Sequence, residues 1–139
     1  MRSLMLVAIV LTLTNCTNRR PPSRERFEIA CNLELPRKFK VTRDEFHDRT
    51  QDFILFYTLK LDSLSMHELS GNIKKSKFYR PDIKIDSHFI RKQYIEENLE
   101  AVWIRTYDGY MFRNKNDNHV VTAIIDTISR QADFIESSD

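Results

Sequence analysis

The sequence contains only two glycines and two cysteines in 139 residues. With so few glycines the chain has no GxGxxG or GxxxxGK[ST] phosphate loop, and it has no GxSxG nucleophile elbow. The longest mainly apolar run, Leu4–Leu13, is ten residues long, whereas a transmembrane helix needs about 20. These absences exclude the common nucleotide-binding loops and leave enzyme activity without a supporting motif.

Positive charge is scarce where a nucleic-acid-binding domain would need it. The net charge is +2, but residues 1–26 alone carry +4, so residues 27–139 carry −2. We therefore expect no nucleic-acid binding by the domain. We also expect no metal and no cofactor, because the histidines have neither HxH nor HExxH spacing. They are His47, His67, His88 and His119.

The first sixteen residues have the pattern of an export signal. Arg2 supplies a positive charge, and the short apolar segment Leu4–Leu13 leads into Leu13-Thr14-Asn15-Cys16. This ending resembles the lipobox of bacterial lipoprotein precursors, with Asn15 where that family usually has Gly, Ala or Ser. The resemblance covers residues 1–16 and implies cleavage before Cys16, which then carries several acyl chains such as palmitate.

The same resemblance implies a cell-envelope protein anchored in the membrane through the lipid on Cys16. Because Thr17 is not aspartate, the outer membrane would be favoured in a Gram-negative host. Two other interpretations stay open: an ordinary signal peptide, which would release a secreted or periplasmic protein, and an uncleaved anchor. With Cys16 acylated, Cys31 has no disulfide partner, and we expect it to be a small buried apolar residue.

Composition predicts three segments in the chain. They are a signal peptide at 1–15, a lipidated cysteine with a flexible tether at 16–26, and a single globular domain at 27–139. The tether has no apolar side chain to bury apart from its prolines. Its arginines would either contact anionic lipid headgroups or form a soluble spacer.

Alternation of apolar and polar residues predicts most strands of the domain. This pattern covers 27–35, and strands are also predicted at 101–107 and 110–113. Residues 53–61 are predicted as a central strand, because both of its faces are apolar through Phe56 and its aromatic and β-branched residues favour a strand. Asp108-Gly109 fits a two-residue hairpin turn with left-handed residues. The remaining segments are predicted as an edge strand at 39–41, a loop or helical turn at 42–51, an irregular stretch at 78–85 and a polar loop at 114–118.

One helix is predicted at residues 66–76. Ser65 and Glu68 have the spacing of a capping box, and Met66, Leu69 and Ile73 form one apolar stripe. Residues 87–98 fit a short second helix slightly better than a strand. These elements, with the strands, predict an α+β fold: a small antiparallel sheet of five or six strands with one or two helices packed on one face.

Two interpretations fit the C-terminal segment. Residues 119–126 and 131–136 alternate like a strand pair joined by a turn near 127–130, and their β-branched residues favour strands. A helical stripe is the alternative, formed by Val121, Ile124, Ile125, Ile128, Ala132 and Ile135.

The predicted hairpin at 101–113 carries a cluster of aromatic residues: Trp103, Tyr107, Tyr110 and Phe112. On one face of the hairpin these side chains would fill the core, which is the usual place for them. On the opposite face they would form an exposed patch of the kind that binds a partner.

From these features we expect a non-catalytic binding role in the cell envelope, with an envelope protein as partner. An alternative is an immunity or inhibitor lipoprotein that neutralises an incoming toxin or enzyme. Its acidic face would come from Asp108, Asp117, Asp126 and Asp133. A small envelope hydrolase is a third candidate, and it would need histidine and acidic side chains that converge in a pocket.

Overall fold

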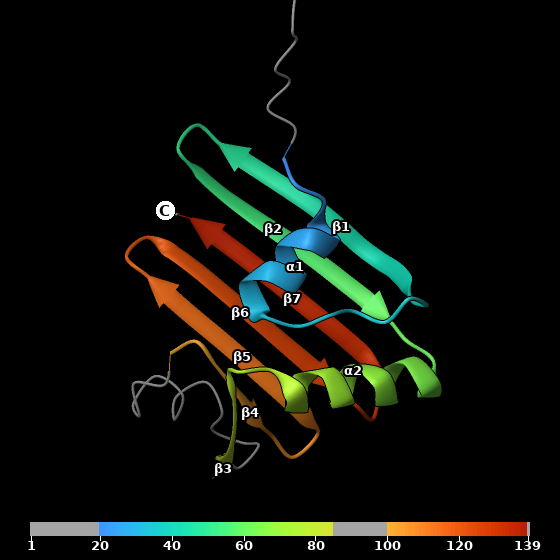
Figure 1. Ribbon diagram of the computed structural model, residues 1–139. Coiled ribbons are helices and arrows are strands. Elements are labelled where there is room, and N and C mark those ends of the chain that lie inside the picture. Colours follow the sequence, from blue (N-terminus) through green and yellow to red (C-terminus); the bar gives the residue numbers. More distant parts are fainter. Residues whose placement is uncertain (1–19, 85–99, 139) are drawn as a thin grey trace, which may run out of the picture.

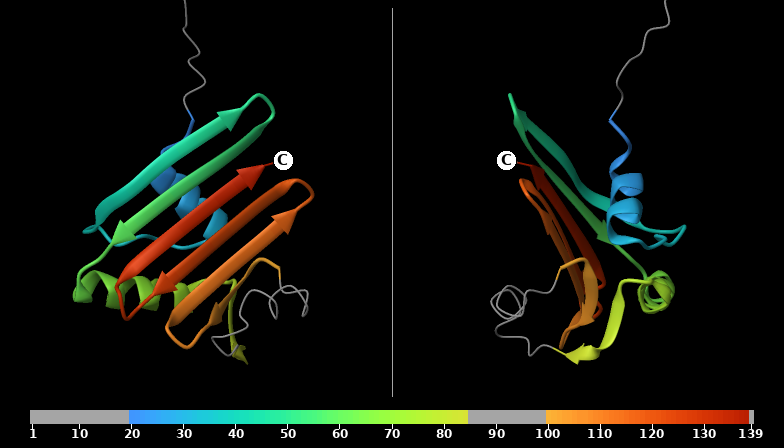
Figure 2. Two further views of the ribbon diagram at one scale, coloured as in Figure 1. Left: turned by 180° about the vertical axis from the view of Figure 1, so that it is seen from behind. Right: turned by 60° about the vertical axis from the view of Figure 1, so that its left-hand side comes forward.

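The computed structural model describes residues 20–84 and 100–138, which form one mixed sheet with two helices on the same face (Figures 1 and 2). The helices are α1 (Ser23–Cys31) and α2 (Ser63–Lys75). The strands are β1 (Lys40–Arg49), β2 (Asp52–Lys60), β3 (Tyr79–Lys84), β4 (Val102–Arg105), β5 (Gly109–Asn116), β6 (His119–Asp126) and β7 (Gln131–Ser138). The predicted α+β class is confirmed, and these residues contain seven strands instead of the expected five or six.

The sheet has the order β1-β2-β7-β6-β5-β4-β3. Every neighbouring pair is antiparallel except β3 and β4, which are parallel. The last strand in the sequence, β7, therefore lies inside the sheet between β2 and β6 (Figure 1). The helices cover one face, and the hydrophobic core lies between them and the sheet.

The prediction of a strand at 27–35 is wrong, because this segment contains α1. Phe27 and Cys31 lie four residues apart and are both buried, so residues that alternate like a strand also fit one face of a helix; Leu35 is buried too, but it follows the helix. Packing against the sheet decides between the two, since the rings of Phe27 and Phe134 stack with centroids 4.8 Å apart. The helix starts at Ser23, so residues 23–26 belong to the domain and not to a tether.

Two strands at the edges of the sheet were mostly missed, although the edge strand expected at 39–41 covers the start of β1. Residues 42–51, expected as a loop or helical turn, mostly belong to β1, and residues 78–85, expected to be irregular, contain β3. Nearly all of β1 is exposed, so it lacks the apolar alternation of a half-buried strand. Its many charged residues are typical of an edge that avoids pairing with other chains. Pro81 lies in β3, and an edge strand tolerates the missing N–H group.

The other strands were predicted, with some differences in their turns. Residues 119–126 and 131–136 form β6 and β7, so the strand pair is confirmed over the helix, and Arg130 has φ 57° in the turn between them. The polar loop expected at 114–118 is wrong in part, because β5 continues to Asn116 and only Asp117-Asn118 form the turn. The short helix expected at 87–98 lies outside the described residues.

The hairpin between β4 and β5 is confirmed, but its predicted turn is wrong. Arg105 pairs with Tyr110, and the turn is closed by the Thr106 N–H donating to the Gly109 carbonyl at 3.0 Å. Neither Asp108 nor Gly109 has a positive φ. Glycine is required here for another reason, because the backbone of β6 lies where a side chain at position 109 would be.

Helix α2 confirms the predicted helix and its buried stripe of Met66, Leu69 and Ile73. The predicted capping box is wrong. The helix starts earlier, and its N-cap is Asp62, whose carboxylate accepts a hydrogen bond from the Ser65 backbone N–H at 2.7 Å. Aspartate is among the strongest N-cap residues, so it takes the role that the sequence pattern suggested for Ser65.

Asp62→Ala should lower the melting temperature by a few degrees at neutral pH, because it removes the acceptor for an unpaired helix N–H group. The Ser65 N–H bond lowers the pKa of Asp62 below its ordinary value. A lowered pKa stabilises the fold above the unfolded-state value, and this contribution is lost as the pH falls through the folded-state pKa. The wild-type and variant melting temperatures, measured by circular dichroism, should therefore converge in acid. Glu68→Ala is the control, because Glu68 takes no part in a cap formed by Asp62. If Ser65 and Glu68 formed a capping box, Glu68→Ala would be destabilising instead.

Candidate functional site

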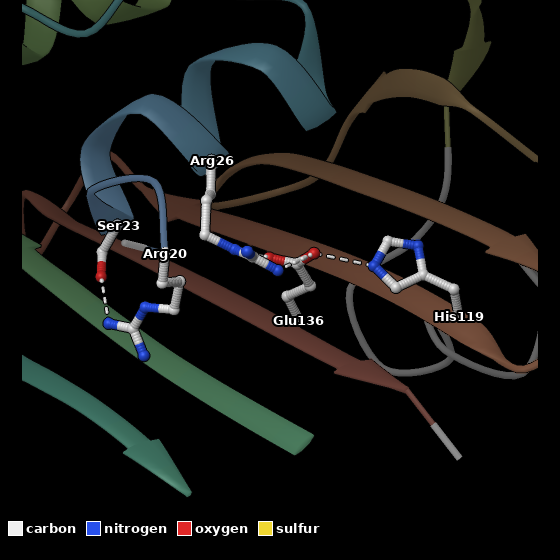
Figure 3. A network of polar contacts seen from close by, with 5 residues as sticks. All are labelled: Arg20, Ser23, Arg26, His119 and Glu136. Atoms are coloured by element: carbon white, nitrogen blue, oxygen red, sulfur yellow. Dashed lines mark hydrogen bonds and ion pairs between the residues drawn. The ribbon is translucent and has the colours of Figure 1, made fainter. Parts of the chain in front are cut away.

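A buried carboxylate joins α1 to the centre of the sheet (Figure 3). Glu136 on β7 is only 5% exposed and faces the helix side. Arg26 of α1 donates to both of its oxygens, from Nε to Oε2 and from Nη2 to Oε1, each at 2.7 Å. The Nε2 atom of His119 lies 2.7 Å from Oε1. This three-residue network gives the buried carboxylate its hydrogen-bond partners and fixes α1 on the sheet.

Other residues near the N-terminal end of α1 also contact the domain. The Arg20 guanidinium lies 4.0 Å from the centre of the Phe46 ring, and the Ser23 hydroxyl donates to Asp44 at 2.6 Å. Arg24 pairs with Glu28 at 3.2 Å and donates to the Leu35 carbonyl. Arg20, Arg24 and Arg26, predicted as tether residues at the headgroups or in solvent, thus bind to their own fold.

The four aromatic residues of the predicted patch do not form a joint surface. Trp103 and Phe112 have no exposed area and Tyr110 has 6%, whereas Tyr107 is 82% exposed in the β4–β5 turn. The indole Nε1 of Trp103 donates to the Cys31 carbonyl at 2.8 Å, which links the sheet to the end of α1. Only Tyr107 of this set is available to a partner.

The four aspartates proposed for an acidic face are separated and have local roles. Asp126 accepts from the N–H groups of Ile128 and Ser129, which form the β6–β7 turn, and Asp133 accepts from Thr58. Asp108 accepts from the hydroxyl of Thr106 in the β4–β5 turn, whereas Asp117 lies in the turn at the opposite end of the sheet. They therefore do not create one acidic surface.

Cys31 is fully buried, and its pKa is raised, mainly by burial and also by the nearby Glu136 carboxylate. The expectation of a small buried apolar residue is confirmed, and the thiol is unreactive in this environment. Cys16 lies outside the described residues. Within 20–84 and 100–138 no three His, Cys, Asp or Glu side chains are placed to hold a metal ion, and no helix is long and apolar enough to span a membrane.

A shallow groove of about 550 Å³ lies where the C-terminal ends of α1 and α2 approach each other. Its lining is mostly polar: Glu28, Ile29, Asn32, Leu33, Glu34, Asn72, Lys75 and Ser76. Several of these groups already bond to one another. The Asn72 amide donates to the Glu34 carbonyl, and the Ser76 hydroxyl donates to Asn32. These bonds therefore join α2 to the segment at the end of α1 across the groove.

The largest candidate interaction surface is the sheet face opposite the helices, here called the open face. No element of the described residues lies over it (Figure 2). The register aligns its side chains in rows across the strands. One row runs Glu45, Phe56, Ile135, Thr122 and Arg113, and the next runs His47, Ile54, Ser137, Val120 and Lys115.

The centre of the open face is apolar and its margins are charged. Ile54, Phe56, Val120 and Ile135 are only partly buried, and Ile124 is 44% exposed. At the β1 margin, Arg43 lies over the Phe56 ring at 4.0 Å and pairs with Glu45 at 2.7 Å. An apolar centre with a polar rim is the usual anatomy of a protein-binding surface.

Sequence reasoning did not identify this surface, although one signal was present. Residues 53–56 are apolar at every position, so β2 carries apolar side chains on both faces of the sheet. Helices cover only one of these faces, so Ile54 and Phe56 extend into the open face, whereas Leu55 is in the core. Continuous apolar runs in strands indicate burial on both sides.

Compared with known protein families, curated proteins and solved structures, the chain shows no significant match. The function therefore has to follow from the residues and their geometry.

Proposed function

We propose that the protein is a membrane-tethered lipoprotein of the cell envelope, whose domain binds an envelope protein and catalyses no reaction. The export signal and Cys16 support the location, because they resemble the N-terminus of bacterial lipoprotein precursors. Several acyl chains on one cysteine give stable membrane attachment, whereas a single chain gives only reversible binding.

The observation that carries the binding role is the open face. Of the five adjacent strands β1, β2, β7, β6 and β5, the middle three present partly exposed apolar side chains there, the outer two supply the polar margins, and no described helix shields this face. With strands about 4.8 Å apart and about 3.3 Å per residue, five strands of eight residues cover roughly 600 Å². This projected area is comparable with the roughly 800 Å² that each protein contributes to an ordinary stable interface. Such an exposed apolar surface is typical of a site for another protein.

Ile124→Lys should reduce partner recovery about tenfold or more, because it places a charge in the apolar centre of the open face. The measurement is quantitative crosslinking followed by affinity capture from solubilised membranes of the producing cell. Ile128→Lys is the matched control, because Ile128 is 72% exposed in the β6–β7 turn, outside this face. Equal recovery by both variants would show that the open face does not bind the partner.

The anchor has its own test, which is the intact mass of the protein extracted from membranes. We expect a chain that starts at Cys16 and carries the mass of two or three acyl groups, whereas Cys16→Ser should give an unacylated protein. A wild-type chain of 139 residues with an unmodified Cys16 thiol would contradict the lipoprotein assignment.

A further inference from the structure

The described fold begins only four residues after Cys16. Arg20 stacks on Phe46 of β1, and Ser23, the first residue of α1, is buried and donates to Asp44. These contacts fix the start of the domain to the β1 side of the sheet. The segment predicted as a ten-residue tether therefore loses its second half to the fold.

The remaining link is short compared with the domain. Four residue steps extend at most ~14 Å, because a fully extended chain gains no more than about 3.6 Å per residue. An eight-residue strand such as β6 is roughly 27 Å long. Part of the link must also cross the headgroup layer, which is about 5–7 Å thick on each side of the hydrocarbon core. Arg20 therefore stays within roughly 10 Å of the headgroups.

We propose that the end of the sheet nearest Arg20 rests against the lipid surface, a proposal that depends on the acylation of Cys16. This apposed end consists of the β1–β2 turn at 50–51, the β5–β6 turn at 117–118 and the C-terminal end of β7. The register places them at one end, since Phe53 pairs with Ser138 and Ser138 pairs with His119. Arg20 lies nearer to this end than to the other, because Phe46, which it contacts, is three residues from the end of β1 and six from its start. Figure 1 shows the β1–β2 turn, the C-terminus and the β5–β6 turn at the same ends of the strands, with the start of α1 over β1.

Charge does not cause this contact. Among the described residues at the apposed end, the exposed charged side chains balance: Arg20, Arg49 and Lys115 against Asp48, Asp52 and Asp117. Such a surface is attracted only weakly to an anionic membrane, because anionic lipids attract clusters of basic residues. The short link imposes the contact, so it should not depend on ionic strength.

The opposite end of the sheet lies far from the membrane in this arrangement. Tyr107, which is 82% exposed, lies in the β4–β5 turn, and Ile128 lies in the β6–β7 turn. The register places both turns a full strand length from the apposed end, because Gly109 pairs with Asp126 and Asp126 with Gln131. A probe at Gln51 and a probe at Tyr107 should therefore report very different distances to lipid.

The test uses the full acylated protein in vesicles of phosphatidylcholine and phosphatidylglycerol that contain a headgroup-nitroxide lipid. A small fluorophore is attached to Gln51→Cys or to Tyr107→Cys, since the buried Cys31 does not compete for labelling. We expect several-fold stronger quenching at position 51 than at 107, unchanged between low and high salt. Equal quenching, or stronger quenching at 107, would overturn the proposal.

A lengthened link provides the matched control. Inserting about 20 Gly/Ser residues between Arg19 and Arg20 makes the link from Cys16 to the domain several times longer. Quenching at position 51 should then fall towards the value at position 107. Quenching that persists would mean that the surface binds lipid by itself, which contradicts an effect of the link. Intact mass of the same samples separates the two proposals. An unmodified Cys16 refutes the lipoprotein assignment, whereas an acylated protein with equal quenching refutes only the apposition.

Discussion

Gly109→Ala should destabilise the domain by about 3 kcal/mol or more, in the upper range for overpacking a rigid site. A Cβ atom at this position would lie 1.8 Å from the carbonyl oxygen of Ile125 and 2.9 Å from its carbonyl carbon. Both are backbone atoms of β6, so no side-chain rotation can relieve the clash. The variant must separate β5 from β6 at the Gly109–Asp126 pair.

The second glycine of the chain provides the matched control. Gly71 lies inside α2, and nothing lies within 4 Å of the position where its Cβ would be. Gly71→Ala should therefore stabilise the domain by about 0.5–1 kcal/mol, because alanine favours a helix over glycine. Urea unfolding of both variants, followed by circular dichroism, measures the two effects. Similar changes of the same sign would contradict the close approach of β6 to Gly109.

Glu136→Ala is the second large effect, with an expected loss of about 3–5 kcal/mol. The substitution removes both hydrogen bonds of the Arg26 guanidinium and leaves this cation, whose side chain is 19% exposed, without its carboxylate. It also removes the contact with His119. Breaking one partner of a buried pair costs more than the pair itself contributes, because the other charge stays buried.

A double replacement tests this explanation. Arg26→Met combined with Glu136→Leu removes both charges and should recover much of the stability lost by Glu136→Ala alone. Glu45→Ala serves as the exposed control, because Glu45 and Arg43 form a solvent-exposed pair and such pairs contribute little. Melting temperature and urea midpoint give the order of the variants. A double variant as unstable as the single one would show that Glu136 acts through something other than Arg26.

Half-buried segments were predictable from sequence, and exposed ones were not. Alternation identified β6 and β7, which have one face in the core and a more exposed face opposite, whereas β2 and β4 were predicted from apolar residues on both of their faces. Edge strand β1 is exposed along almost its whole length, so its sequence has no such pattern. The alternating pattern in the sequence arises from the difference in burial between the two faces of a strand. An edge strand that is exposed on both faces shows little of this difference.

The N-terminal helix shows a different limit. Phe27 and Cys31 fit both a strand and a helix, and contacts with distant residues, such as the stack of Phe27 on Phe134 more than a hundred positions away, select the helix. The Arg26–Glu136 pair has the same long-range origin. Glu136 continues the buried series Ala132 and Phe134, and a buried glutamate needs a charged partner. The sequence could not indicate that this partner is Arg26.

The position of β7 determines when this protein can complete its fold. The β1–β2 hairpin and the strands beyond β6 meet only through the C-terminal strand, which pairs with both sides along its whole length. Until residues 131–138 leave the ribosome, the two parts of the sheet lack the strand that pairs with both of them. Such late, long-range closure slows folding, because the pairing of β2 with β7 joins residues far apart in the sequence.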